Sequence, residues 1–171
     1  MLERKLFILS LFLWKNTNMF PSVQKYEASL AIREPRIVSI RGPFIPSEHD
    51  ITIFRGGDPK SKVDERDQSA LYFKIEEDER FVGDSGYDGE PSKVVTTKDE
   101  HSSEFKEFLA RAKNRQETFH TRLKSFNVLG TRFRHGTNPK ERMRLHKMAV
   151  EAVSGIVQTD YLNGHPPFDI C

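Results

Sequence analysis

Alternating apolar and polar positions near the start of the chain predict a β-hairpin. Every second residue from Tyr26 to Ile32 is apolar, which is the pattern of a strand with one buried face. A second short apolar run, Ile37–Ile40, follows the tight link Arg33–Arg36, so the two strands are expected to pair antiparallel. The segment Gly42–Pro46 is rich in glycine and proline and is expected to end the regular structure.

An apolar run, Leu6–Trp14, precedes the hairpin and follows the charged start Met1–Lys5. It resembles the beginning of a signal peptide, but it is too short to span a membrane and no small-residue cleavage site follows it. Secretion is therefore not expected, and a buried strand is the alternative interpretation. Residues 1–22 are assigned to an atypical N-terminal segment, and residues 23–171 to a single domain.

The rest of the chain predicts short elements followed by two long helices. His49–Arg55 favours a short helix with Asp50 as its N-cap, and Lys93–Thr97 favours a short strand. The long helical region Ser102–Leu129 has apolar residues at helical spacing, and Glu141–Tyr161 predicts a final helix. The core positions expected in the first of these regions are Phe105, Phe108, Leu109, Ala112, Phe119, Leu123 and Phe126. This order of elements indicates a mixed α/β fold.

Charge is distributed unevenly although the net charge of the 171 residues is only +2. Residues 48–107 contain 17 acidic and 9 basic side chains, whereas residues 111–147 contain 11 Lys and Arg against two acidic residues. Such a basic block favours a polyanionic partner, most plausibly nucleic acid, and a solvated helical face is the alternative. The only cysteine, Cys171, is the last residue, so the sequence predicts neither a disulfide framework nor a cysteine metal site.

A carboxylate stands directly after an expected strand in the segment Arg80–Tyr87. The apolar pair Phe81-Val82 ends that strand, and two glycines bracket Asp84 and Ser85. Ligands of open α/β sheets bind at the ends of strands, so Asp84 is a candidate site residue. The alternative is that Asp84 only stabilises a turn, because Asp and Gly are common turn residues.

Four stretches in a fixed order resemble the DDE-superfamily endonucleases of PIF/Harbinger-type transposases. The similarity extends over roughly residues 25–170, and the closing segment Asn163-Gly164-His165-Pro166-Pro167-Phe168-Asp169 agrees with it. The four stretches are Lys25-Tyr26-Glu27 with Arg36–Phe44, His49–Arg55, Gly83–Tyr87 and Asn114–Lys124.

The resemblance implies a fold and a chemistry. The fold is an RNase H-like mixed sheet flanked by helices, and the chemistry is phosphodiester cleavage and strand transfer on DNA by two divalent ions, Mg²⁺ or Mn²⁺, that three carboxylates hold. Asp84 matches the second acidic residue of the family and Glu117 matches the third. Arg115, Arg122 and Lys124 flank Glu117 and are candidate phosphate contacts. The resemblance also implies a nuclear location and no membrane association.

The sequence departs from the family pattern at the first catalytic carboxylate. The family places that Asp on a strand upstream of the hairpin, and here this region is Leu6–Trp14, which contains no acidic residue. We therefore expect an incomplete fold, in which the first catalytic strand is lost or replaced by this apolar run, and impaired chemistry. The DNA-binding region that complete transposases carry before this domain is also missing, so a partner protein is expected to supply DNA binding.

Several alternatives remain open from the residues. Asn114 and Glu117 have the spacing of a capping box, which would give Glu117 a structural role. Asp50 fits the His-Asp motif of the family and is a site-adjacent candidate, although an N-cap role is equally consistent. At the level of function, the alternatives are a non-catalytic nucleic-acid-binding or interaction module, and the product of an incomplete gene copy that does not fold stably.

Overall fold

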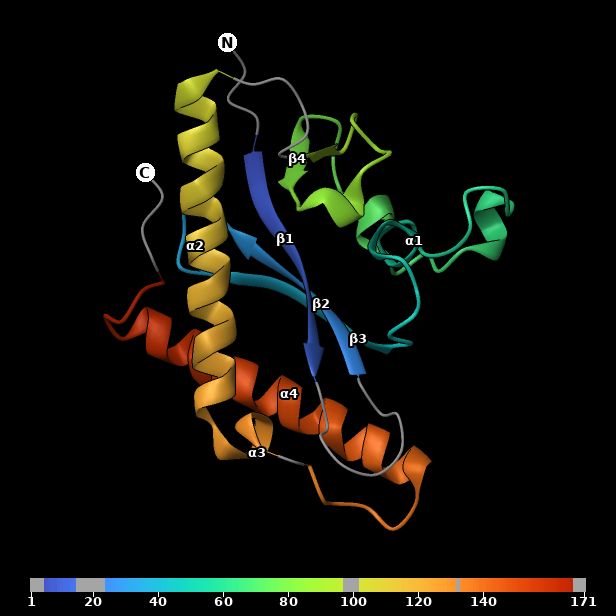
Figure 1. Ribbon diagram of the computed structural model, residues 1–171, viewed down its shortest axis with the longest axis vertical. Coiled ribbons are helices and arrows are strands. Elements are labelled where there is room, and N and C mark those ends of the chain that lie inside the picture. Colours follow the sequence, from blue (N-terminus) through green and yellow to red (C-terminus); the bar gives the residue numbers. More distant parts are fainter. Residues whose placement is uncertain (1–4, 15–23, 97–101, 132, 168–171) are drawn as a thin grey trace.

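One five-stranded sheet organises the chain, with the N-terminal strand at its centre (Figure 1). The computed structural model describes residues 5–14 by their backbone, and residues 24–96, 102–131 and 133–167 in full. Strand β1 (Lys5–Trp14) pairs antiparallel with β2 (Gln24–Ala31) and parallel with β4 (Glu79–Val82). The strand order is β3-β2-β1-β4-β5, so the apolar run at the start of the chain forms the central strand. The mixed α/β class expected from the sequence is confirmed.

The predicted hairpin is confirmed, but its second strand is longer than expected. Strand β3 (Ile37–Phe44) pairs antiparallel with β2 and continues through Gly42 and Pro43 with a shift in register. The prediction that regular structure ends at Gly42 is therefore wrong. Gly42 has a φ of 132°, and a Cβ at this position would lie 2.9 Å from the carbonyl oxygen of Lys25. Glycine thus lets the two backbones approach closely at the irregular part of the ladder.

Short elements cover the β4–β5 end of the sheet. Helix α1 (Asp50–Arg55) ends at Gly56 in the left-handed conformation, and three 3₁₀ turns and β5 (Val94–Val95) follow along the chain. The turns are η1 (Val63–Glu65), η2 (Leu71–Phe73) and η3 (Ser85–Tyr87). Together with β4, these elements bury a small apolar cluster of Phe54, Leu71, Phe81, Tyr87 and Val94. Thr97, at the end of the predicted strand, lies outside the described residues.

Two long helices provide the larger core. Helix α2 (Ser103–Ser125) runs along the sheet (Figure 1). Helix α4 (Pro139–Leu162) crosses the sheet near the C-terminal end of α2. The short helix α3 (Asn127–Gly130) lies between α2 and α4 in the chain. The core positions predicted for α2 are confirmed, since all seven are buried or packed against the cluster. That cluster contains Tyr26, Ala28, Leu30, Ile32, Val82, Leu109, Ala112, Phe119, Leu123, Leu129, Val150, Val153, Val157 and Tyr161.

Two neighbouring residues of β4 belong to different apolar clusters. Val82 belongs to the larger cluster with α2 and α4, whereas Phe81 belongs to the smaller one with α1. Successive side chains of a strand point to opposite faces, so the sheet has a helical face and an α1 face. None of the helices in the described part of the chain has the length and apolar character needed to cross a bilayer.

Candidate functional site

Asp84 lies just beyond the end of β4, as the sequence predicted, and its side chain is exposed. It is the N-cap of the 3₁₀ turn Ser85–Tyr87, in which its Oδ1 accepts a hydrogen bond of 2.8 Å from the backbone N–H of Gly86. Asp84 therefore stabilises this turn, and its further role as a site residue stays a prediction. One oxygen of the Asp84 carboxylate accepts this local hydrogen bond, and the carboxylate lies just beyond the C-terminal end of β4.

The carboxylate of Asp50 lies close to that of Asp84, on the other side of Gly86. A Cβ built on Gly86 would lie 2.5 Å from Oδ2 of Asp50 and 3.0 Å from Oδ1 of Asp84. Glycine is needed here because a side chain has no room between the two carboxylates. The structure therefore brings the carboxylates of Asp50 and Asp84 together at Gly86.

The buried ammonium of Lys25 compensates the charge of Asp50. Its Nζ binds Oδ1 of Asp50 and donates a hydrogen bond of 2.8 Å to the carbonyl oxygen of Glu48. The prediction that Asp50 is the N-cap of α1 is wrong, because His49 occupies that position and no side chain caps the helix. Asp50 is the first residue of the helix, and its carboxylate turns to the lysine instead.

We expect Gly86→Ala to lower the free energy of unfolding by about 1–2 kcal/mol, because the new methyl group would displace Asp50 from Lys25. Ser85→Ala, in the same turn, is the matched control and is expected to change stability little. Urea unfolding of the three proteins measures the difference. Equal stability of Gly86→Ala and the wild-type protein would contradict the close approach of the two carboxylates.

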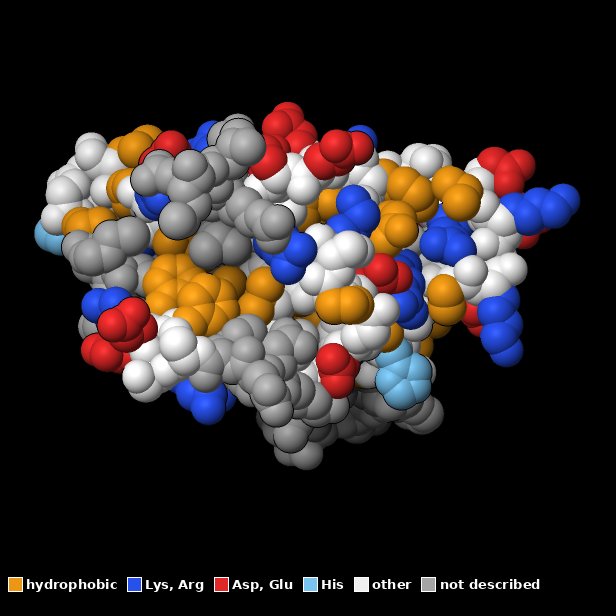
Figure 2. All heavy atoms as spheres, turned by 90° about the horizontal axis from the view of Figure 1, so that it is seen from above, with side chains coloured by type: hydrophobic (Ala, Val, Ile, Leu, Met, Phe, Trp, Pro, Cys, Tyr) orange, Lys and Arg blue, Asp and Glu red, His pale blue; other side chains and the backbone are white. Residues whose placement is uncertain are grey.

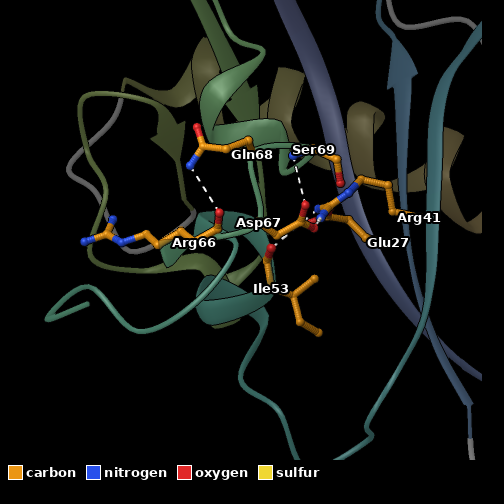
Figure 3. Close-up of polar contacts among 7 residues, drawn as sticks. All are labelled: Glu27, Arg41, Ile53, Arg66, Asp67, Gln68 and Ser69. Carbon is orange, nitrogen blue, oxygen red and sulfur yellow. Dashed lines mark hydrogen bonds and ion pairs between the residues drawn. The ribbon is translucent and has the colours of Figure 1, made fainter. Parts of the chain in front are cut away.

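A network of charged residues joins β2 and β3 to the loop after α1 (Figure 3). Glu27 of β2 is fully buried, and its Oε2 lies 2.6 Å from Nη1 of Arg41 on β3. Nη2 of Arg41 lies 2.6 Å from Oδ2 of Asp67. Burial raises the pKa of Glu27 to about 7, although Arg41 opposes the shift. Hydrogen bonds from Ser69, together with the charge of Arg41, lower the pKa of Asp67.

The buried side chain of Tyr87 lies within the electrostatic influence of Glu27 and of the two aspartates. Its side chain is fully buried, and burial together with the charges of Glu27, Asp50 and Asp84 raises the pKa of its hydroxyl well above the usual value. The hydroxyl therefore stays protonated at neutral pH. The site near the end of β4 thus contains several carboxylates, with Lys25 and Arg41 as the neutralising cations.

Sequence reasoning did not identify Glu27 or Arg41 as part of a site. A signal was present, because Glu27 is the one charged residue between Tyr26 and Ile32 and Arg41 is its register partner on the next strand. Oppositely charged residues that face each other directly on antiparallel strands form favourable pairs. The alternation shows only that Glu27 lies on the face opposite Tyr26, and it does not show that α1 and the following loop cover this face.

Glu117 lies in the second half of α2 and is exposed. The capping-box interpretation is wrong, because the helix begins at Ser103 and Ser102 is its N-cap; Asn114 lies within the helix. Among the described residues, no group of three His, Cys, Asp or Glu side chains could hold a metal ion. Within the described part of the chain, neither Asp84 nor Glu117 thus belongs to a complete set of metal ligands.

The three predicted phosphate contacts differ in their surroundings. Arg115 is buried, and its Nη2 donates to the carbonyl oxygen of Glu34 in the β2–β3 turn. Nη1 of Arg122 lies 3.0 Å from Oδ2 of Asp160, and its guanidinium stacks 4.9 Å from the ring centroid of Tyr161. Only Lys124, of these three, is exposed. Two of the three cations therefore hold α2 against the β2–β3 turn and α4.

One face of the molecule carries a mixture of acidic and basic side chains. Figure 2 shows acidic and basic side chains interspersed at the end of the molecule from which it is viewed. On that face, the charge asymmetry of the sequence does not produce a surface of one sign. Comparison with known proteins adds no assignment, since no family model, no curated protein and no solved structure matches the chain.

Proposed function

We propose that the chain is a transposase-derived, DDE endonuclease-like protein with an RNase H-like fold and impaired chemistry. The ordered motifs of the sequence carry the resemblance, and a mixed sheet with an upstream central strand and flanking helices supports it. DNA is the proposed substrate and the nucleus the proposed compartment. Mg²⁺ or Mn²⁺ is the proposed ion, because carboxylate oxygens are the ligands these hard cations prefer.

The composition of β1 is the observation on which this proposal rests. The strand lies between β2 and β4, and it contains no Asp or Glu from Lys5 to Trp14. The family places its first catalytic carboxylate on the strand upstream of the hairpin, which is the position of β1. Asp84 and Glu117 would remain as ligands, and two carboxylates do not complete the donor set of a two-ion centre. The residues present therefore do not fit a functional pair of ions.

The backbone register supports Ser10 as the position at which the proposed family would carry its first carboxylate. Ile8 is paired with Val82, so Ser10 stands two residues further along β1, at the level that Asp84 occupies beyond β4. On its other side Ser10 is paired with Ala28, which is fully buried in the larger core. Ser10 is thus the position of β1 closest in register to the aspartate.

We expect Ser10→Asp to raise Mn²⁺-dependent cleavage of duplex DNA by at least about a hundredfold, because a complete metal site supplies several kcal/mol of transition-state stabilisation. The wild-type protein is expected to cleave very slowly. Ser10→Asn has nearly the same shape without the charge and is the matched control. A nicking assay measures the rates, and calorimetry measures Mn²⁺ affinity independently of cleavage.

Two outcomes would contradict the proposal. Robust cleavage by the wild-type protein that Asp84→Ala abolishes would show that the chemistry is not impaired. If Ser10→Asp gained neither Mn²⁺ affinity nor cleavage over Ser10→Asn, the proposed nuclease ancestry would lose its structural basis. In the expected case, the added activity of Ser10→Asp disappears when Asp84→Ala is combined with it.

A further inference from the structure

Helix α4 has apolar side chains on two opposite faces. Val150, Val153 and Val157 are buried against the larger core. On the other side, Met148 and Ile156 are 51% and 54% exposed, and the exposed Ala152 lies between them at a spacing of four residues. We call Met148, Ala152 and Ile156 the outer stripe. The structure leaves these three residues uncovered.

The outer stripe is open enough for another helix to approach. A Cβ built on Gly155, beside the stripe, meets no atom within 4 Å. Small residues such as Ala152 and Gly155 permit close contact between helix backbones, and Met148 and Ile156 can interdigitate with side chains of a second helix. An exposed apolar stripe on a polar helix is a typical docking surface for a partner helix.

The charges beside the stripe indicate the nature of the partner. Arg142 and Asp160 are five helical turns apart and so lie on the same flank of α4. Asp160 remains 45% exposed although it binds Arg122. After Lys147 the helix contains no further Lys or Arg, so its first half is basic and its second half is acidic. A partner helix in the opposite direction with the same charge distribution would be complementary.

The other flank of α4 also carries two residues at this spacing. Arg144 and Leu162 are also five turns apart, and Leu162 lines an open groove of about 450 Å³ with Glu34, Pro35 and Gln158. Arg36 also lines the groove, and its Nε lies 3.2 Å from Oε2 of Glu34, so this carboxylate already has a cation. What the groove offers to a side chain from an antiparallel helix is its apolar wall, on which the long stem of an arginine can pack.

We propose that the outer stripe of α4 binds a second copy of this chain, with the two α4 helices antiparallel about a twofold axis near Ala152. Met148 of one copy then faces Ile156 of the other. Arg142 faces Asp160 on one flank, and the stem of Arg144 packs beside Leu162 on the other flank. A parallel pair would instead bring opposite flanks together and place Arg142 of one copy beside Arg144 of the other, so the charges select the antiparallel arrangement.

Sedimentation equilibrium of the full chain tests the association. The wild-type protein is expected to form a dimer whose population rises with concentration. Ile156→Glu is expected to weaken the dimer at least about tenfold, because it buries an unpaired charge in the contact. Val63→Glu changes an equally exposed apolar residue on η1 and is the matched control. Circular dichroism establishes that each variant keeps its fold.

Cysteine cross-linking tests the direction of the helices. In a Cys171→Ser background, an oxidised mixture of Met148→Cys and Ile156→Cys variants is expected to form mainly mixed disulfides, and Ala152→Cys is expected to cross-link to itself. A monomer at every concentration would overturn the proposal, as would equal effects of Ile156→Glu and Val63→Glu. Predominant self-cross-linking of Met148→Cys would overturn the antiparallel arrangement. None of these outcomes depends on the proposed nuclease ancestry.

Discussion

Arg41→Met is expected to lower the free energy of unfolding by about 3–5 kcal/mol at pH 8, because it leaves a buried carboxylate without its opposite charge. Glu27 is fully buried, and Arg41 is the cation that lies 2.6 Å from it. Methionine retains much of the volume of the arginine stem, so the loss reports mainly on charge. Urea unfolding with the slope held common to all variants measures the effect.

The double variant Arg41→Met with Glu27→Gln is the control. Removing both charges together is expected to restore most of the lost stability, so the two substitutions should be strongly non-additive. A loss below about 1 kcal/mol for Arg41→Met, or additive effects in the double variant, would contradict a buried ion pair worth this much.

The pH dependence provides a second check on Glu27. Its pKa is raised from 4.5 to about 7 in the folded protein, so between these values the native state binds the extra proton. The contribution of Glu27 to stability is therefore complete below pH 4.5 and is lost as the pH rises through about 7. Glu27→Gln removes this decline. The penalty of Arg41→Met should also be smaller at pH 5 than at pH 8, because a protonated Glu27 needs no cation.

The elements of the fold could be predicted from sequence where periodicity is strong. Alternation over Tyr26–Ile32 and helical spacing from Phe105 to Phe126 identified β2 and the core face of α2. The C-terminal part of β3 was missed because Gly42 and Pro43 normally end a strand, whereas here they lie in an irregular stretch of the ladder. Local composition does not reveal which strand will pair with such a segment.

The candidate site was less predictable because it depends on contacts between distant segments. Asp84 was found because glycines mark its turn, but the approach of Asp50 to Gly86 joins positions far apart in the chain. The spacing of Asn114 and Glu117 suggested a cap, although the same spacing occurs inside any helix. The roles of Arg115 and Arg122 as internal anchors likewise required the tertiary structure, because flexible basic side chains have the same sequence signature on a surface.

Acidification from pH 7 to pH 4 is expected to cost about 3 kcal/mol of stability for each of two buried histidines, His120 and His146. Burial lowers the pKa of both from 6.5 to about 4, and the charge of Lys124 adds to the effect at His120. Between these values the unfolded chain binds more protons than the native protein, so stability falls as the pH is lowered through this window. Nδ1 of His146 lies 2.8 Å from the hydroxyl of Tyr26, beside the ring of Phe133. A charged imidazole would therefore lie among buried aromatic groups.

Unfolding free energies measured from pH 4 to pH 7 test this expectation. His146→Gln is expected to be less stable than the wild-type protein at pH 7 but to lose less stability on acidification. His165→Gln, which changes an exposed histidine, is the matched control and should follow the wild-type profile. If His146→Gln and His165→Gln gave the same slope with pH, protonation of His146 would not drive acid unfolding. The helix α4 would then be held to β2 by apolar contacts whose strength does not depend on the charge of this imidazole.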